Sequence, residues 1–401
     1  MGRGVMLGIL AFGMWATAAA AATVAPGADR LSEPAFSKLF DGKKLGVLAH
    51  SASRLAGGTH LVDYLHSHYR LRAIFAPEHG FRGKADEPVG DSRDEATGLP
   101  VYSLYGPRRA PTQAQLAALD AVVVDLQDVG IRFYTYPATV GLLLKACAQA
   151  HKPVILLDRP NPLGLSVVEG AVLEKRWAGR MTAFYPTTML HGMTLGELAR
   201  LYNEQLAIHA DLTVVPVAGL TRSTSWNETG LEWRAPSPAL TSAEQALLYD
   251  TFGTLETFNI AVGRGADNSQ AFRVFGAPWI TAGQAQRLAS VLEAAKLPGL
   301  RFRAVQWVPT RREFEGKLCR GFHVELADAR VLEPFRSLVT AIRAMRAVLG
   351  PRLAENGIDV ALGAAWVRSS IDRGVPVKSI LGRARAEAAP FLRERARASL
   401  Y

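Results

Sequence analysis

The sequence predicts an α/β protein, with a Rossmann-like parallel sheet in the N-terminal domain and a smaller α+β C-terminal domain. Short apolar runs of strand length alternate with helix-like segments through the first half of the chain, which is typical of βαβ units. The second half mixes short strands and helices without this regular alternation. A length of 401 residues with 49% hydrophobic residues favours two globular domains over one.

Residues 1–22 have the features of a secretory signal peptide. Arg3 supplies a positive charge, Val5–Trp15 is apolar, and Ala18–Ala22 is a run of small residues suited to cleavage. The apolar run is too short to span a bilayer comfortably, although a retained N-terminal anchor is the alternative. We therefore expect an exported, periplasmic protein whose first domain covers residues 23–240 and whose second covers residues 241–401.

The elements of the first half are expected in the order of a parallel sheet. The segment Ala121–Leu126 is continuous and rich in β-branched residues, as in a central strand buried on both faces. Further strands are expected at Leu45–His50, Leu71–Phe75, Pro153–Leu157 and Leu212–Val217, with helices at Leu61–His68, Pro111–Leu119 and Thr139–His151. Thr194 precedes another helix, and Glu197 stands at the spacing of a capping box.

The second half is expected to contain fewer strands. Strand-like patterns occur at Leu255–Ile260, Arg301–Trp307 and Leu318–Leu326. Helices are expected at Ser242–Tyr249, Thr281–Ala295, Leu332–Leu349 and through the arginine-rich segment Trp366–Tyr401.

Three expected strands end in polar loops. These loops are Glu78–Arg82, Asp125–Arg132 and Asp158–Asn161. Ligands of open α/β sheets bind at the carboxyl ends of the strands, so we predict that the three loops meet in one pocket. The alternative for the first loop is a polar turn in which Glu78 is only a cap.

Several classes of protein are disfavoured by the motifs. A G-x-G-x-x-G after a strand, a P-loop, a G-x-S-x-G and an S-x-x-K are all absent. The nine histidines and two cysteines show no zinc-ligand spacing, and no nucleic-acid-binding motif accompanies the net charge of +10. We therefore expect no cofactor, no metal and no nucleic acid partner. Cys147 and Cys319 could pair after export, but Cys147 lies in an apolar helical segment and also fits a buried thiol.

What remains is a set of carboxylates beside aromatic residues and arginines in an exported protein. Glycoside hydrolysis requires a carboxyl group that protonates the leaving oxygen. Aromatic rings can stack on sugar faces, and arginine binds a substrate carboxylate through two hydrogen bonds. These residues therefore favour a glycosidase.

The motifs then point to a family. The segments PEHGFRG (Pro77–Gly83), TGLPVYSLYG (Thr97–Gly106), DLQDVGIRFYTY (Asp125–Tyr136), LDRPNPLG (Leu157–Gly164), HGMTLGELA (His191–Ala199), E-x-x-N-x-x-x-GRG (Glu256–Gly265) and GAPWI (Gly276–Ile280) occur in this order. In these segments the chain resembles exo-β-N-acetylmuramidases of the NamZ type, glycoside hydrolase family 171.

The resemblance implies removal of N-acetylmuramic acid from the non-reducing ends of peptidoglycan fragments, in a cleft between the two domains. Glu78 matches the motif carboxylate that would serve as general acid, with Glu256 as the second carboxylate or as a plain strand residue. His79 and Arg82 would orient Glu78 or bind the lactyl carboxylate. The remaining expected site residues are Asp128, which we also group with the catalytic residues, and the substrate-binding residues Arg132, Tyr134, Asp158, Asn161, His191 and Arg264.

The chain departs from the expected family pattern near the presumed cleft. His50 stands in a loop where an asparagine is expected, Ala239 replaces another asparagine, and Thr257-Phe258 replaces Gly-Thr. Two alternatives therefore stay open: a non-catalytic cell-wall sugar-binding protein, and a glycosidase for another N-acylated sugar. The stereochemical course and the oligomeric state are also open at this point.

Overall fold

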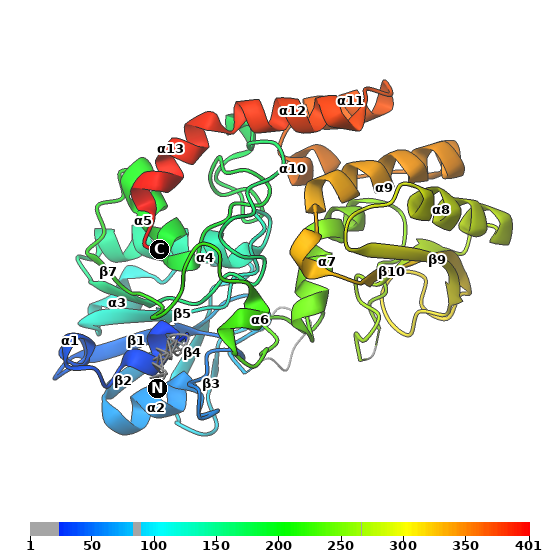
Figure 1. The fold of residues 1–401 in the computed structure, drawn as a ribbon. Helices are drawn as coiled ribbons and strands as arrows, with labels where there is room; N and C mark the ends of the chain where they lie inside the picture. The colour runs from blue at the N-terminus through cyan, green and yellow to red at the C-terminus, as the bar shows by residue number, and fades with distance from the viewer. Residues whose placement is uncertain (1–23, 83–89, 266) are drawn as a thin grey trace, which may run out of the picture.

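The computed structural model describes residues 24–82, 90–265 and 267–401, so the expected signal peptide lies outside the described residues. Two units follow one another along the chain (Figure 1). The first unit, residues 24–242, contains a seven-stranded sheet of order β3-β4-β2-β1-β5-β6-β7. Its strands are β1 Lys44–Ala49, β2 Arg70–Ala76, β3 Ser92–Arg93, β4 Pro100–Ser103, β5 Ala121–Asp125, β6 Val154–Leu157 and β7 Leu212–Val215.

The predicted parallel sheet is confirmed. All neighbouring strands are parallel except β3 and β4, which pair antiparallel at the edge. Every residue of β5 is buried, as the continuous apolar pattern predicts. Val122 and Val124 belong to one core cluster, and Val123 belongs to the cluster on the other face. The sheet is therefore the middle of three layers.

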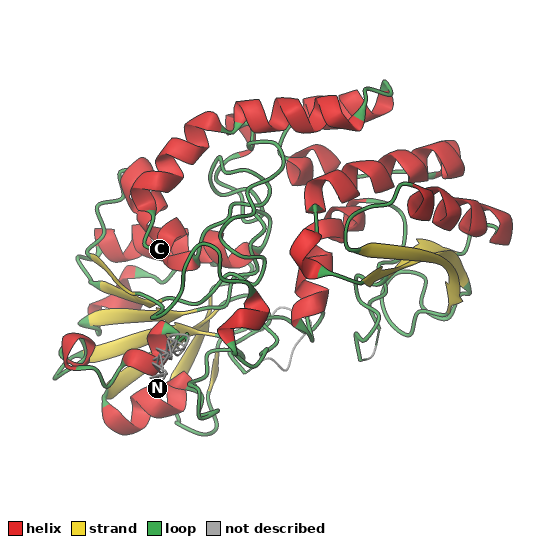
Figure 2. Cartoon of the chain, in the orientation of Figure 1, coloured by secondary structure: helices red, strands yellow, loops and turns green. Residues whose placement is uncertain are grey.

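Helices cover both faces of this sheet (Figure 2). Leu61 and Leu65 of α2 pack on one face, whereas Leu143 and Leu144 of α4 pack on the other. The bounds in the first unit are η1 Gly27–Arg30, α1 Pro34–Ser37, α2 Leu61–His68, α3 Gln113–Ala117, α4 Thr135–Gln149, η2 Lys175–Trp177, α5 Leu195–Gln205 and α6 Trp226–Thr229. The predicted capping box of α5 is confirmed.

The second unit, residues 243–357, has a three-stranded antiparallel sheet of order β8-β10-β9. Its elements are α7 Ala243–Phe252, η3 Gly253–Thr257, β8 Val274–Ala277, α8 Ala282–Ala294, β9 Leu300–Trp307, β10 Cys319–Leu326, η4 Ala329–Val331, α9 Pro334–Leu349 and η5 Gly350–Arg352. The expected strand at Leu255–Ile260 is wrong. This segment continues α7 as a 3-10 helix through Thr257. The chain then makes only isolated bridges, from Phe258 to Glu355 and from Ala261 to Gly276 of β8.

The last four helices connect the two units. They are α10 Ile358–Leu362, α11 Ala365–Asp372, α12 Val377–Glu387 and α13 Ala389–Ala398, and α11 to α13 run from the second unit back to the first (Figure 1). The C-terminal Tyr401 hydroxyl then donates to Asp158 at the end of β6. One apolar cluster contains residues of both sheets and of these helices. The division near residue 240 stays a prediction.

The two cysteines are not paired with each other. Cys147 and Cys319 are both free and buried, so the buried-thiol alternative is confirmed. Burial raises their pKa values to about 12 and about 11.

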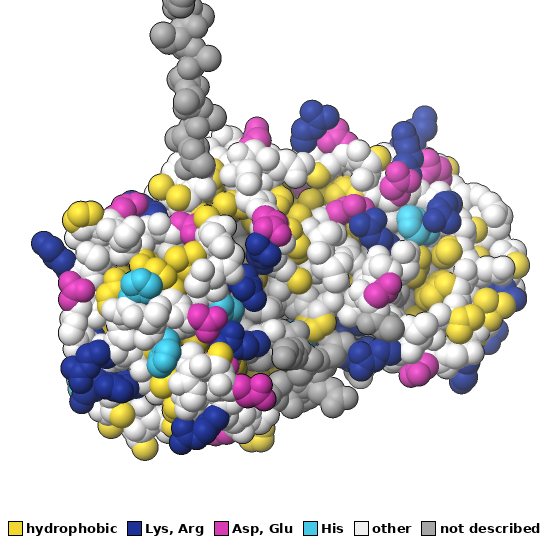
Figure 3. Space-filling view, turned by 90° about the horizontal axis from the view of Figure 1, so that it is seen from below, with side chains coloured by type: hydrophobic (Ala, Val, Ile, Leu, Met, Phe, Trp, Pro, Cys, Tyr) yellow, Lys and Arg dark blue, Asp and Glu magenta, His cyan; other side chains and the backbone are white. Residues whose placement is uncertain are grey.

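No helix in the described part of the chain has the length and apolar character needed to cross a membrane. On the face shown in Figure 3, basic and acidic side chains are interspersed, so the positive net charge is not gathered there into one patch.

Candidate active site

A cavity of about 380 Å³ lies between the two units. The first unit contributes residues that follow β2, β4 and β5, together with Thr182 and three residues of the segment 237–240. The second unit contributes residues of α7, η3 and two loops. The lining residues are Glu78, His79, Tyr105, Phe133, Tyr134, Thr135, Thr182, Ser237, Ala239, Leu240, Tyr249, Glu256, Arg264, Phe272 and Arg312. The cavity thus combines two carboxylates, two arginines, a histidine and a wall of aromatic rings.

Glu78 is held at the end of β2 by hydroxyl groups of the first unit. Thr135 Oγ1 donates to Glu78 Oε2 over 2.7 Å, and Tyr105 lines the cavity beside Glu78. Burial and the Glu78 carboxylate raise the pKa of Tyr105 to about 12. Tyr136 Oη lies 3.4 Å from the Glu78 carbonyl oxygen and 2.6 Å from that of Pro236, to which it donates. Glu78 therefore faces the cavity in a fixed orientation rather than capping a helix.

The backbone reverses sharply just after Glu78. His79 and Gly80 have φ values of +69° and +74°, a left-handed conformation that glycine adopts without cost but histidine rarely adopts. The reversal brings the His79 side chain to the cavity wall beside Glu78. Strain at a non-glycine residue is typical of functional sites.

Glu256 supplies the second carboxylate, from η3 of the second unit. Its Oε1 lies 2.5 Å from Arg264 Nη2, and the Arg264 guanidinium lies 5.6 Å above the Phe272 ring. A third of the Glu256 side chain, 33%, stays exposed through the cavity. Burial raises the pKa of Glu256, Arg264 opposes this shift, and the nearby Glu78 charge adds to it. The two carboxylates are thus close enough to affect each other.

Aromatic rings form one wall of the cavity. The Tyr249 ring makes edge contacts with Phe133, Tyr134 and Phe272, at centroid distances of 5.6, 6.2 and 4.8 Å. Such a cluster is rigid and offers apolar faces against which a sugar ring can stack. Tyr134, which the sequence predicted, therefore lies in the cavity.

Arg82 does not line the cavity, although it follows Glu78 closely in the sequence. Its Nε donates to Asp94 and its Nη2 donates to Asp63, each over 2.8 Å. These two carboxylates raise the pKa of Arg82 and hold its guanidinium away from the cavity, which Arg82 does not line. The predicted role of Arg82 beside Glu78 is not supported by this placement.

Arg132 is also outside the cavity. Its guanidinium is buried and donates to the carbonyl oxygens of Ala171, Thr187 and Ala361. Burial lowers its pKa to about 9. Ala361 lies in α10, so Arg132 ties the C-terminal helices to the first unit.

Asp128 and His191 form a separate buried pair. Asp128 Oδ2 lies 3.3 Å from His191 Nε2, and both side chains are almost completely buried. Asp250 of α7 is buried as well, and burial together with the Asp128 charge raises its pKa. None of the three lines the cavity, so the expected catalytic role of Asp128 is not supported by this placement.

Asp158 and Asn161 are covered by α5 and the C-terminal tail. Asp158 accepts from Thr194 Oγ1, Gly196 N and Tyr401 Oη at 2.7, 2.8 and 2.6 Å. Asn161 donates to the Met193 carbonyl oxygen over 3.1 Å. The expectation that all three strand-end loops meet in one pocket is therefore wrong, because no residue of Asp125–Arg132 or of Asp158–Asn161 lines the cavity. Beyond β6, the N-terminus of α5 fills the space next to Asp158.

The three departures from the family pattern have different positions, and of these Thr257 and Phe258 do not line the cavity. His50 is completely buried, accepts from Gln127 N over 2.8 Å, and packs behind the Tyr136 ring. Ala239 lines the cavity. Only the Ala239 difference therefore changes the surface that a ligand would meet.

Sequence reasoning missed several cavity residues. Tyr105 and Thr135 lie inside the family motifs quoted above, where their hydroxyl groups were a usable signal. Ser237, Tyr249 and Arg312 gave no such signal, because each reaches the cavity from a segment distant from Glu78. In the described part of the chain, no group of three or more His, Cys, Asp or Glu side chains is arranged to hold a metal ion.

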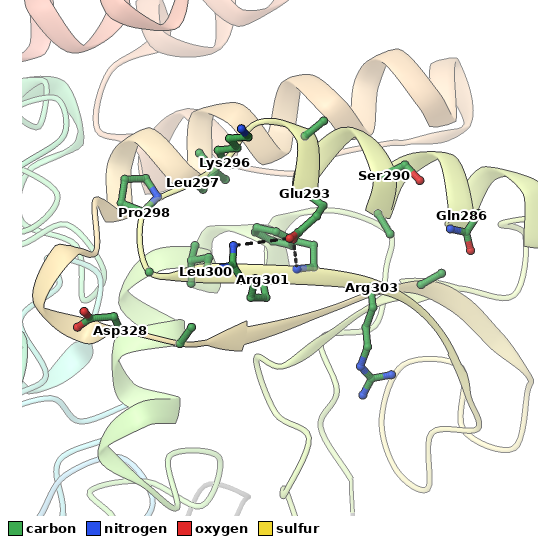
Figure 4. A pocket seen from close by; sticks show the side chains of 16 residues that line it. Gln286, Ser290, Glu293, Lys296, Leu297, Pro298, Leu300, Arg301, Arg303 and Asp328 are labelled. Atoms are coloured by element: carbon green, nitrogen blue, oxygen red, sulfur yellow. Dashed lines mark hydrogen bonds and ion pairs between the residues drawn. The ribbon is translucent and has the colours of Figure 1, made fainter.

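A larger hollow of about 1050 Å³ lies between α8 and β9 of the second unit (Figure 4). There Glu293 accepts from the backbone N–H of Phe302 over 2.8 Å and lies 3.7 Å from Arg301. Glu293 thus covers part of the open edge of β9. None of the predicted site residues lines this hollow, so the smaller cavity between the units is the better candidate.

Comparisons with known proteins agree on one family. The family description "Exo-beta-N-acetylmuramidase NamZ, N-terminal" matches residues 45–244, and its C-terminal counterpart matches residues 247–401. The peptidoglycan beta-N-acetylmuramidase NamZ of Bacillus subtilis (strain 168) is 36% identical over 355 residues, covering 87% of this chain and 84% of that protein.

Two crystal structures of DUF1343 family proteins from Bacteroides fragilis NCTC 9343 have a similar fold. One, at 1.65 Å resolution, is 28% identical with a TM-score of 0.84. The other, at 1.30 Å resolution, is 27% identical with a TM-score of 0.74. Each comparison covers 94% of this chain and 99% of the other.

Proposed function

Because the chain belongs to the exo-beta-N-acetylmuramidase NamZ family, we propose that it releases N-acetylmuramic acid from the non-reducing ends of peptidoglycan fragments. Family membership makes the protein a glycoside hydrolase. The observation that carries the specific proposal is the pair Glu78 and Glu256, which come from different units and face one cavity with an aromatic wall.

Glu78 is the proposed general acid. It would donate a proton to the oxygen of the breaking glycosidic bond, so that the shortened glycan leaves with a hydroxyl group. Water then supplies the oxygen that ends on C1 of the released N-acetylmuramic acid. The bond from Thr135 supports this role because it fixes the carboxyl group at the cavity wall, and fixed geometry is what proton transfer requires.

Glu256 is the proposed second carboxylate. Its ion pair with Arg264 favours the charged form, which would stabilise the positive charge that develops on the sugar ring in the transition state. Burial acts against this charge and raises its pKa. As the pH is lowered, kcat should therefore fall with an apparent pKa above the ordinary glutamate pKa. This fall should disappear in Glu256→Gln.

The cellular setting is part of the proposal. The signal-like residues 1–22 would direct the protein to the periplasm, where peptidoglycan fragments arise during cell-wall turnover and recycling. Processing at the end of this segment, read from the N-terminal sequence of the secreted protein, tests it.

The function is tested with 4-nitrophenyl β-N-acetylmuramide and the matching N-acetylglucosaminide. We expect turnover of the muramide and a loss of about 10²- to 10⁴-fold in kcat for Glu78→Gln, with substrate binding retained. Glu325→Gln, at an exposed position of β10, is the matched control and should retain activity. Full activity in Glu78→Gln would overturn the acid assignment. A folded wild-type protein that binds the muramide without cleaving it would instead be the non-catalytic sugar-binding protein.

A further inference from the structure

We propose that Thr135 is the positioning residue of the general acid, because its hydroxyl group keeps the proton for transfer on Oε1 of Glu78. This inference rests on the proposed function, since it concerns the acid step at the same site. It predicts that Thr135 matters most for glycosides whose leaving group depends on that proton. Thr135 lines the cavity together with Glu78, although it follows β5 and Glu78 follows β2.

The Thr135 hydroxyl group donates in one direction. Its Oγ1 lies 2.7 Å from Glu78 Oε2, a short separation of the kind that a hydroxyl group makes with a carboxylate. In the described part of the chain, this hydroxyl group makes no other hydrogen bond. Thr135 is also buried, with 9% of its surface exposed, so little water can compete for the bond. The hydroxyl hydrogen therefore points at Oε2.

This bond distinguishes the two oxygen atoms of the acid. In a protonated carboxyl group, one oxygen carries the proton and donates, while the carbonyl oxygen is the better acceptor. Because Oε2 accepts from Thr135, it acts as the carbonyl oxygen, and the proton is on Oε1. During the reaction the Oε1–H bond breaks and the proton binds the glycosidic oxygen. The bond from C1 to that oxygen breaks at the same time, and its electron pair stays with the leaving group.

The same bond stabilises Glu78 after the proton has left. Glu78 is then a carboxylate, and a hydroxyl group that donates to a carboxylate makes a stronger, charge-assisted bond. Thr135 is also the first of the 15 residues of α4, so the positive end of the helix dipole lies next to Glu78. Both effects stabilise the negative charge that the acid acquires as the leaving group departs.

The first turn of α4 holds Thr135 in place. Its carbonyl oxygen accepts from Thr139 Oγ1 over 3.1 Å, and the branched Cβ atom of threonine restricts rotation about χ1. The next residue, Tyr136, donates to the Pro236 carbonyl oxygen, and its Oη lies 3.4 Å from that of Glu78. Two successive residues of α4 therefore contact the side chain and the backbone of Glu78.

The test compares two glycosides of N-acetylmuramic acid that have different leaving groups. The 4-nitrophenolate ion is stable and leaves with little help from an acid, whereas a sugar alkoxide must be protonated as it leaves. The first substrate is therefore 4-nitrophenyl β-N-acetylmuramide. The second is the disaccharide in which N-acetylmuramic acid is β-1,4-linked to N-acetylglucosamine. Chromatography measures the N-acetylmuramic acid released from each.

Three variants separate the hydroxyl group from the rest of the side chain. Thr135→Val keeps the shape of the side chain but cannot donate. Thr135→Ser keeps the donor but lacks the methyl group that restricts its rotation. Thr251→Val is the matched control, because Thr251 is a buried residue of α7 that does not line the cavity. Its hydroxyl group donates to the Leu247 carbonyl oxygen of the same helix over 2.8 Å.

We expect Thr135→Val to lower kcat for the disaccharide by about 10- to 100-fold, with a smaller loss for the nitrophenyl glycoside. Thr135→Ser should recover most of the activity on the disaccharide, because it restores the donor to Oε2. Thr251→Val should keep the wild-type ratio of the two kcat values. Glu78→Gln removes the acid itself and should shift this ratio in the same direction as Thr135→Val, and further.

An equal loss on both glycosides in Thr135→Val would overturn the inference, since a purely structural role affects every leaving group alike. An unchanged kcat for the disaccharide would overturn it too, as would a Thr135→Ser variant as impaired as Thr135→Val. If Glu78→Gln lost no more activity on the disaccharide than on the nitrophenyl glycoside, the acid assignment in the proposed function would be wrong instead. A folded wild-type protein that cleaves neither glycoside would overturn the proposed function itself.

Discussion

Replacing Asp158 by asparagine should change how protein stability depends on pH while leaving turnover intact. Asp158 is completely buried, and burial raises its pKa to about 6 from the ordinary value of 3.8, although three donors oppose the shift. This difference of about 2 pH units corresponds to ~3 kcal/mol of folding free energy. The folded state therefore favours the protonated acid.

The sign follows from this preference. The stabilisation from protonated Asp158 is fully present below pH 3.8 and is lost as the pH rises through about 6. Asparagine stays neutral throughout, but its amide nitrogen cannot accept a hydrogen bond. The donors at one of the two oxygens therefore lose their acceptor, either Thr194 and Tyr401 at Oδ2 or Gly196 N and Arg159 N at Oδ1. The variant should thus carry a constant penalty at every pH. On top of that penalty, its stability relative to the wild type should rise by ~3 kcal/mol between pH 4 and pH 7.

Urea unfolding at a series of pH values measures this difference directly. Asp211→Asn, at an exposed position before β7, serves as the control. Its difference in unfolding free energy from the wild type should not change with pH. A difference in unfolding free energy between Asp158→Asn and the wild type that does not change with pH would refute the reasoning. Loss of muramide turnover in folded Asp158→Asn would show instead that Asp158 belongs to the site, contrary to its place under the C-terminal tail.

Three further predictions concern packing, the Glu78 loop and the thiols. Gly141→Ala would place a Cβ atom 2.1 Å from the buried Phe184 ring, so calorimetry should show a loss of ~1–3 kcal/mol; an unchanged Tm would contradict the tight contact. Tyr136→Phe removes the donor 2.6 Å from the Pro236 carbonyl oxygen, which should cost ~1–3 kcal/mol and lower kcat, whereas Tyr64→Phe on α2 should do neither. Cys147 and Cys319 should react with a thiol reagent only after unfolding, and a reductant should leave Tm unchanged; native reactivity would contradict their burial.

The architecture of the first unit follows from local patterns in the sequence. Its strands are short apolar runs, and β-branched residues such as Val122 to Val124 favour a strand buried on both faces wherever they stand in the chain. The position of Glu78 past a strand end is also a local property, since a proline stops β2 immediately before it. Motif order then identified the family. Periodicity misled at Leu255–Ile260, where a strand-like pattern forms a 3-10 helix and an isolated bridge.

Which polar side chains face the cavity depends on contacts between segments that are distant in the sequence. Arg82 is withdrawn by Asp63 and Asp94, and Asp158 is covered by Tyr401, which stands 243 positions away. Arg312 reaches the cavity because the second unit folds against the first. The direction of a side chain beyond a strand end depends on charges and hydroxyl groups that the fold brings near from distant segments. Spacing along the chain does not encode those distances, so the motifs located the cavity but not all of its residues.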